Sequence, residues 1–180
     1  MKKAWLVLMA VLVVLSPAIL RADEQKEECV MPPAYTGSAE FQKIKSLAGT
    51  WEAPDPTNIS GDGKTRVTYE VTSNGYAVLE RFNPGTPSEM VSIYHDEKGK
   101  LAMTHYCAIG NRPRLALESA SGNEIKLSLA KGSGINPKTE DHMHAVRLVF
   151  AGPDEIQQEW WGYKAGKPMA PMSIALKRVK

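Results

Sequence analysis

The sequence predicts an all-β protein, an up-and-down antiparallel β-barrel of about ten strands preceded by a short N-terminal helical turn. Two observations carry this prediction. Apolar and polar residues alternate along many short segments, and brief turns rich in Gly, Pro, Asn and Asp separate those segments. Such turns are too short for the crossover helices that parallel strands need, so neighbouring strands are expected to pair antiparallel. Closure removes the two sheet edges, which favours a barrel over the competing two-sheet sandwich.

The composition fits one globular domain. The chain has 180 residues, of which 43% are apolar and 23% are charged, and it contains 2 cysteines. These values exclude a disordered chain, a disulfide-rich mini-protein, a polytopic membrane protein and a repetitive fibre. A net charge of +2 is too small to indicate a nucleic-acid-binding protein.

Residues 1–22 have the pattern of a secretory signal peptide. Lys2-Lys3 precedes an apolar run over residues 4–15, and Ser16-Pro17 interrupts that run before small residues. Cleavage after Ala22 or Ala18 would leave no stable membrane span, so the mature protein is predicted to be exported, either periplasmic or secreted. An uncleaved anchor is the alternative, because about 17 mostly apolar residues reach the lower limit for crossing a bilayer.

Residues 23–37 are expected to form a flexible leader, because they lack an apolar period and contain Pro32-Pro33. Residues 38–180 would then form the single domain. Cleavage removes three basic residues and no acidic one, which leaves the mature chain nearly neutral. A nearly neutral surface argues against nucleic acid or an acidic membrane as partner.

The expected elements follow in order. Ser38 is a candidate N-cap for a helical turn in which Phe41, Ile44 and Leu47 recur every three residues. A first strand is expected near 50–53. Residues 66–71 and 76–82 should then form a hairpin, because Ser73-Asn74-Gly75 suits a tight turn with positive φ. The remaining strands are expected at residues 90–95, 101–109, 114–119, 124–130, 143–150, 155–163 and 173–178.

The segment Leu47-Ala48-Gly49-Thr50-Trp51-Glu52, between the helical turn and a run of hairpins, resembles the start of the calycin group. That group includes lipocalins, fatty-acid-binding proteins and related exported bacterial barrels. Residues 101–114, with Thr-His-Tyr-Cys and Gly-Asn-Arg-Pro-Arg, are similar to uncharacterised bacterial lipocalin-like proteins. The resemblance implies a lipocalin-like barrel that holds something, with Gly49 and Trp51 on the first strand and Trp51 plugging the closed end. Haem-binding barrels belong to the same group, but no motif here singles them out.

Histidine and cysteine are the main candidates for chemistry. On a regular strand His105 and Cys107 share an otherwise apolar face, and so do His142 and His144, so both pairs are expected to point inward. If the strands alternate in direction, the four side chains end near one mouth of the barrel. Imidazole and thiolate are ligands that zinc and copper prefer, which makes these four residues candidate ligands of zinc, copper or haem. The alternative is that these histidines are merely hydrogen-bonded at a wet mouth.

The two cysteines leave two alternatives open. In an oxidising compartment Cys29 could form a disulfide with Cys107, or Cys107 could be a free, buried thiol. Cys107 and His105 lie two residues apart on one strand face, a spacing compatible with a nucleophile and its base, but nothing marks an oriented base or an oxyanion hole. Catalysis is therefore not expected. Glu80 and Glu159 are possible inward-facing acids without an assigned role.

These observations predict an exported barrel that binds a small apolar or amphipathic ligand in its interior or at its mouth. Arg112 and Arg114, in and after the turn that follows Cys107, would suit an acidic ligand end, although a solvated turn is the alternative for Arg112. A cell-envelope metal or haem protein is the second possibility. A filled barrel with a structural or protein-binding role is the third, because small barrels can be filled by side chains alone. The expected ligand-binding residues are Met103, His105, Cys107, Arg112, Arg114, His142, His144, Val146 and Leu148.

Overall fold

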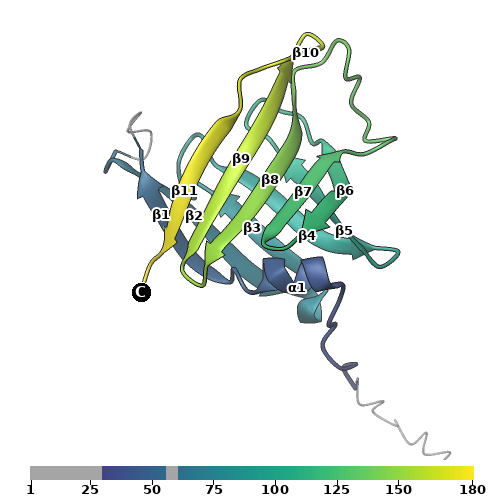
Figure 1. The fold of residues 1–180 in the computed structure, drawn as a ribbon, viewed down its shortest axis with the longest axis vertical. Helices are drawn as coiled ribbons and strands as arrows, with labels where there is room; N and C mark the ends of the chain where they lie inside the picture. Colours follow the sequence, from purple (N-terminus) through teal and green to yellow (C-terminus); the bar gives the residue numbers. More distant parts are fainter. Residues whose placement is uncertain (1–29, 56–60) are drawn as a thin grey trace, which may run out of the picture. The chain divides into compact units, whose positions relative to one another are not determined.

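Ten strands close into an antiparallel barrel in the computed structural model, which describes residues 30–55 and 61–180 (Figure 1). The all-β barrel with one short helix that the sequence predicts is therefore confirmed. It is consistent with a calycin-like fold. The expected signal peptide and Cys29 lie outside the described residues.

The elements follow the expected order. The helix α1 spans Ala39–Lys45, and a single 3-10 turn, η1, spans Ser73–Gly75. The strands are β1 (Gly49–Pro54), β2 (Lys64–Thr72), β3 (Ala77–Phe82), β4 (Met90–Glu97), β5 (Lys100–Tyr106), β6 (Arg114–Ser121), β7 (Glu124–Leu129), β8 (His142–Gly152), β9 (Glu155–Lys164), β10 (Lys167–Pro168) and β11 (Met172–Arg178).

Consecutive strands from β1 to β9 pair as neighbours, and β11 closes the ring between β9 and β1. The seam to β1 is short, because only Trp51↔Arg178 and Glu52↔Lys177 pair across it. The two-residue strand β10 pairs with the far end of β9 on the same side as β11. Away from the seam, the end of β11 that begins at Met172 has β9 as its only strand partner among the described residues.

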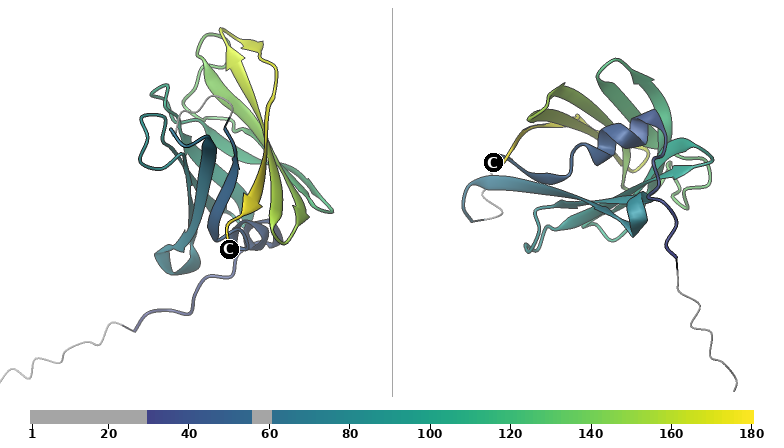
Figure 2. Two further views of the ribbon diagram at one scale, coloured as in Figure 1. Left: turned by 90° about the vertical axis from the view of Figure 1, so that its left-hand side faces the viewer. Right: turned by 90° about the horizontal axis from the view of Figure 1, so that it is seen from below.

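The helix α1 lies across one end of the barrel (Figure 2, right). Its N-cap is Ser38, whose Oγ accepts a hydrogen bond from the backbone N–H of Phe41 at 3.1 Å. Phe41 and Ile44 are fully buried in the barrel core, so the helix covers this end by burying its apolar face. None of the helices in the described part of the chain is long and apolar enough to cross a bilayer.

Trp51 lies beside this helix and is fully buried. Its indole Nε1 donates to the backbone oxygen of Leu47 at 2.7 Å, and the guanidinium of Arg178 lies 4.3 Å from the ring centroid. Gly49 has a φ of 130°, a conformation that favours glycine. The structure thus places the Gly49-x-Trp51 pair at the end of the barrel that α1 covers.

Residues 33–37 are ordered against the barrel, although the sequence places them in a flexible leader. The Tyr35 ring stacks on that of Tyr76 at 4.4 Å, and its hydroxyl donates to the Asp96 carboxylate at 3.1 Å. The compact unit begins at Pro33. The local sequence of this segment does not predict these contacts, because their partners, Tyr76 and Asp96, lie far along the chain.

Candidate functional site

A row of polar side chains crosses the inner face of four neighbouring strands. The strand register pairs Tyr69 on β2 with Glu80 on β3, Glu80 with Ser92 on β4, and Ser92 with His105 on β5. All four are buried. Along β3 this polar row separates Val78, which belongs to the core, from Phe82, which lines a cavity. The row therefore forms a boundary between the packed core and the open end.

Side chains from two further inward positions, Tyr94 and Gln158, donate hydrogen bonds to this row. The hydroxyl of Tyr94 donates to Glu80 Oε2 at 2.6 Å. From β9, Gln158 Nε2 donates to the hydroxyl of Tyr69 at 2.5 Å and to Glu80 Oε1 at 3.1 Å. Gln158 Oε1 accepts from Trp160 Nε1 at 3.0 Å. A buried carboxylate is tolerable here because each of its oxygens has a donor.

Burial shifts the protonation of this network toward neutral forms. It raises the pKa of Glu80, although the donors Tyr94 and Gln158 oppose the shift. It also raises the pKa values of Tyr69 and Tyr94 well above the ordinary value, and the neighbouring Glu80 carboxylate adds to both shifts. Burial lowers the pKa of His105 to about 4. The imidazole of His105 is therefore neutral at physiological pH.

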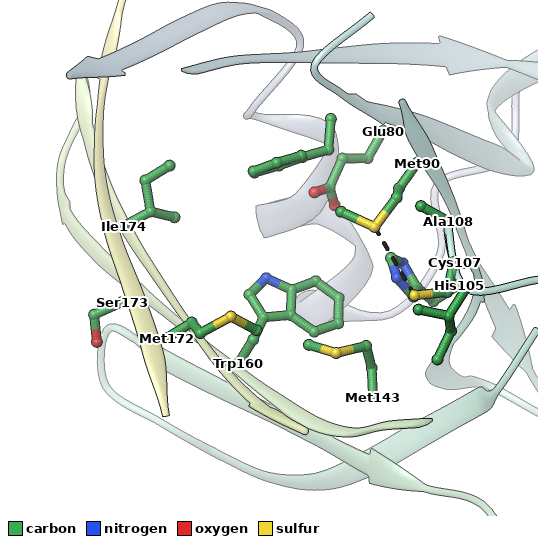
Figure 3. Close-up of a pocket in the computed structure, with 12 residues that line it drawn as sticks. Glu80, Met90, His105, Cys107, Ala108, Met143, Trp160, Met172, Ser173 and Ile174 are labelled. Carbon is green, nitrogen blue, oxygen red and sulfur yellow. Dashed lines mark hydrogen bonds between the residues drawn. The ribbon is translucent and has the colours of Figure 1, made fainter. Parts of the chain in front are cut away.

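A cavity of about 330 Å³ opens beside this row, at the end of the barrel away from α1 (Figure 3). That volume lies within the range of small-molecule sites. Glu80 and His105 contribute its most deeply buried polar groups, and no lysine or arginine is among its described lining residues. The remaining lining residues are mostly apolar or sulfur-containing: Phe82, Met90, Cys107, Ala108, Ile109, Met143, Trp160, Met172, Ser173 and Ile174.

His105 and Cys107 both line this cavity, as the sequence predicts, but they differ in their backbone setting. His105 lies within β5, and its Nδ1 is 3.0 Å from Ser92 Oγ. Its ring contacts that of Trp160, with centroids 5.0 Å apart. Cys107 lies just after β5, which ends at Tyr106 and not at Ile109 as expected. The chain turns there because Gly110 donates its N–H back to the carbonyl of Cys107 at 3.0 Å.

His142 and His144 do not point into the barrel, so the expectation that the four side chains converge was wrong. The cause is a β-bulge in β8, where the register to β9 shifts between Met143 and Ala145. The extra residue, His144, is turned to the outer face, and Met143 faces the cavity instead. His142 Nε2 lies 3.0 Å from His144 Nδ1, and the ring of His144 stacks on Tyr163 at 4.0 Å.

Five other expected ligand-binding residues lie elsewhere. Arg114 faces outward and forms an ion pair with Glu97, to which its Nε donates at 2.7 Å. Arg112 is exposed in the turn before β6. The expectation of a guanidinium for an acidic ligand end was therefore wrong. Met103, Val146 and Leu148 are fully buried in the core and do not line the cavity.

The described residues contain no group of three or more His, Cys, Asp or Glu side chains placed to hold a metal ion. The proposed zinc or copper set of His105, Cys107, His142 and His144 is thus split, with two residues inside and two outside. Cys107 has no disulfide partner within the described ranges. Its pairing with Cys29 stays a prediction.

The sequence assigns no role to Glu80 and does not single out Ser92, Tyr94 or Gln158. One signal marks three of the four positions. Glu80, Ser92 and Gln158 occupy inward positions of their strands, where alternation predicts an apolar residue, and their neighbours two positions away are largely apolar. A polar side chain there must find buried partners, but the strand pattern does not say which.

No protein-family model matches this chain, and no curated protein matches it significantly.

Proposed function

We propose that this protein is an exported, lipocalin-like binding protein that takes a small, mainly apolar ligand into the cavity beside the polar row. The observation that carries the proposal is the combination of an apolar wall with buried polar groups at its base. An apolar wall stabilises a ligand by removing its surface from water, and a few buried polar groups orient it.

The polar groups also favour one kind of ligand end. Glu80 accepts hydrogen bonds, and its cavity has no lysine or arginine among the lining residues. A ligand carboxylate would be buried there without a counter-charge, which is unfavourable. A neutral ligand with a hydroxyl or N–H donor fits better than the acidic ligand end that the sequence suggested.

A fluorescence titration with N-phenyl-1-naphthylamine tests this proposal. The probe is apolar and neutral, carries one N–H donor, and brightens in apolar surroundings. We expect saturable binding with one site per chain. The anionic probe anilinonaphthalene sulfonate should bind at least about 10-fold more weakly, because its charge would be buried without a partner.

Two tryptophan substitutions on β11 provide a matched pair. Ile174 lines the cavity, whereas its neighbour Ala175 is exposed on the other face of the strand. Ile174→Trp should fill the cavity and weaken probe binding about 10-fold or more, and Ala175→Trp should leave it within about 2-fold. Equal effects of the two substitutions, or no probe uptake by the unaltered protein, would favour a filled barrel with a structural role.

Export is a separate part of the proposal, supported by the basic and apolar pattern of residues 1–22. Intact mass of the full-length gene product, recovered from the periplasm or medium of a bacterial host, checks it. A mass that lacks the first 18 or 22 residues supports export. The uncleaved mass in the cytoplasmic or membrane fraction contradicts it.

A further inference from the structure

Soft metal ligands gather on one wall of the same cavity. Met90 begins β4, and Cys107 follows the end of β5. The register pairs Ser92 with His105, so Met90 and Cys107 are the next inward pair along the two strands. Their sulfur atoms, Sδ and Sγ, lie 3.9 Å apart (Figure 3, dashed line). Two sulfur atoms and an imidazole therefore belong to one small patch of inner surface.

The imidazole of His105 has an unused polar atom. Its Nε2 is buried and has no hydrogen-bond partner among the described residues, while only 3% of the whole residue is exposed. Ser92 Oγ engages the other nitrogen, Nδ1, at 3.0 Å. A metal-ligating histidine is usually oriented in this way, through a hydrogen bond from its second nitrogen. When Nδ1–H donates to Ser92, Nε2 carries the free lone pair.

The sulfur spacing suits a shared ion. If both sulfur atoms bound one ion at about 2.3 Å, the usual metal–thiolate distance, their 3.9 Å separation would subtend an angle of roughly 115°. That angle is close to the 120° of trigonal coordination. The third position of a trigonal site would fall to a ligand from the same wall, and His105 Nε2 is the available donor.

We propose that Met90 Sδ, Cys107 Sγ and His105 Nε2 form a binding site for monovalent copper, Cu(I). Thiolate and thioether ligands select Cu(I), whereas a thioether is a poor ligand for zinc or other harder divalent ions. On binding, the Cys107 thiol releases its proton to solvent and its sulfur bonds the ion, and the oxidation state of copper does not change. Met143 and Met172 line the same cavity.

The site goes beyond the proposed apolar-ligand function, although Met90, His105 and Cys107 belong to the lining of the same cavity. It also differs from the metal set expected from sequence, because the thioether of Met90 takes the place of the outward His142 and His144 beside His105 and Cys107.

Anaerobic titration of Cu(I) against the chromophoric chelator bicinchoninate tests the proposal. Cys29→Ser is included in every sample, so that Cys107 is the sole thiol. We expect one equivalent of Cu(I) to be withdrawn from the chelator and Zn(II) to fail to compete. X-ray absorption of the loaded protein should show sulfur and nitrogen ligands together.

Matched variants distinguish the loss of a ligand at the proposed site from the loss of a methionine elsewhere in the barrel. Met90→Leu and Cys107→Ser should each weaken Cu(I) binding at least about 100-fold, because each removes a direct ligand. Met103→Leu is the control, because Met103 also faces inward on β5 but is buried in the core away from the cavity. It should change the affinity by less than about 2-fold.

Three outcomes would overturn the proposal: no Cu(I) withdrawn from the chelator, equal effects of Met90→Leu and Met103→Leu, or a loaded protein with no sulfur ligand. The naphthylamine titration of the unaltered protein is read separately. Probe uptake without Cu(I) withdrawal overturns the copper site alone, and Cu(I) withdrawal without probe uptake overturns the apolar-ligand function alone, so the two failures remain distinguishable.

Discussion

The inner wall formed by β4 and β5 and the outer surface of β8 and β9 both carry histidines beside aromatic rings, but with opposite environments. On the inner wall, His105 is buried, contacts Trp160 and has one nitrogen without a partner. On the outer surface, His144 is partly exposed, stacks on Tyr163 and binds His142. A regular ladder holds the first histidine inward, and a bulge turns the second outward. The comparison shows that one extra residue in a ladder decides whether a polar side chain belongs to a binding site or to the surface.

The adjacent residues Trp160 and Trp161 give the largest contrast between the two surfaces. Trp160 faces inward and donates to Gln158, whereas Trp161 faces outward, with Lys126 Nζ 5.9 Å from its ring centroid. Trp160→Ala should lower the free energy of unfolding by about 3–5 kcal/mol, and Trp161→Ala by about 1 kcal/mol. Urea denaturation measures both.

If Trp160→Ala does not fold, Trp160→Phe retains one aromatic ring while it removes the donor to Gln158 and some ring volume. A loss of about 1–3 kcal/mol is then expected. Equal losses for the inward and outward tryptophans would contradict the assigned orientation of β9.

The dependence of the free energy of unfolding on acid pH should differ between the two histidines His105 and His144. Because the folded-state pKa of His105 is about 4 and the ordinary value is about 6.5, the unfolded chain binds a proton that the folded chain does not. The free energy of unfolding should therefore fall as the pH drops from about 6.5 to about 4, by about 3 kcal/mol in total. His105→Gln should remove most of this slope in denaturant unfolding at a series of pH values.

His144→Gln is the outer-surface control. Desolvation and the neighbouring His142 also lower the pKa of His144, so its contribution has the same sign. It should be smaller, because the imidazole is partly exposed. If the dependence of the free energy of unfolding on pH remains in His105→Gln and is lost in His144→Gln, the outer histidine is its source and the prediction for His105 is wrong.

Removal of a tyrosine hydroxyl should lower stability more on the inner wall than on the outer surface. Tyr94→Phe leaves Glu80 Oε2 without its donor at 2.6 Å, and it should cost about 1–3 kcal/mol at neutral pH. The lost bond stabilises the charged carboxylate, so the cost should shrink as acid protonates Glu80. Tyr163→Phe, on the outer surface, should change stability by less than about 0.5 kcal/mol. Thermal or urea unfolding at two pH values checks all three statements.

The smallest effect is expected at Arg114. Its ion pair with Glu97 is partly exposed, with 33% and 37% of the two side chains accessible. Arg114→Ala should therefore cost at most about 1 kcal/mol, as surface ion pairs do. Naphthylamine binding should be unchanged in the same variant. A clear loss of probe affinity would mean that this guanidinium reaches the cavity after all.

Local sequence determined the strands, the turns and the helical cap. Alternation at 66–71 and the Ser73-Asn74-Gly75 turn predict the β2–β3 hairpin correctly, and Ser38 caps α1 as expected. The end of β5 at Tyr106 was not predicted by the strand pattern. Apolar residues continue to Ile109, but the turn at Cys107 and Gly110 takes the chain away from the ladder.

Tertiary structure alone decided the site. Whether Glu80 is an isolated buried acid or a paired one depends on Tyr94, Gln158 and the register that brings them together. His144 was predicted inward because a period of two assumes an unbroken ladder, and the bulge at Met143 breaks it. The physical reason is common to both cases. A residue's own neighbours set its secondary structure, but which strand pairs with it, and in which register, sets what its side chain meets.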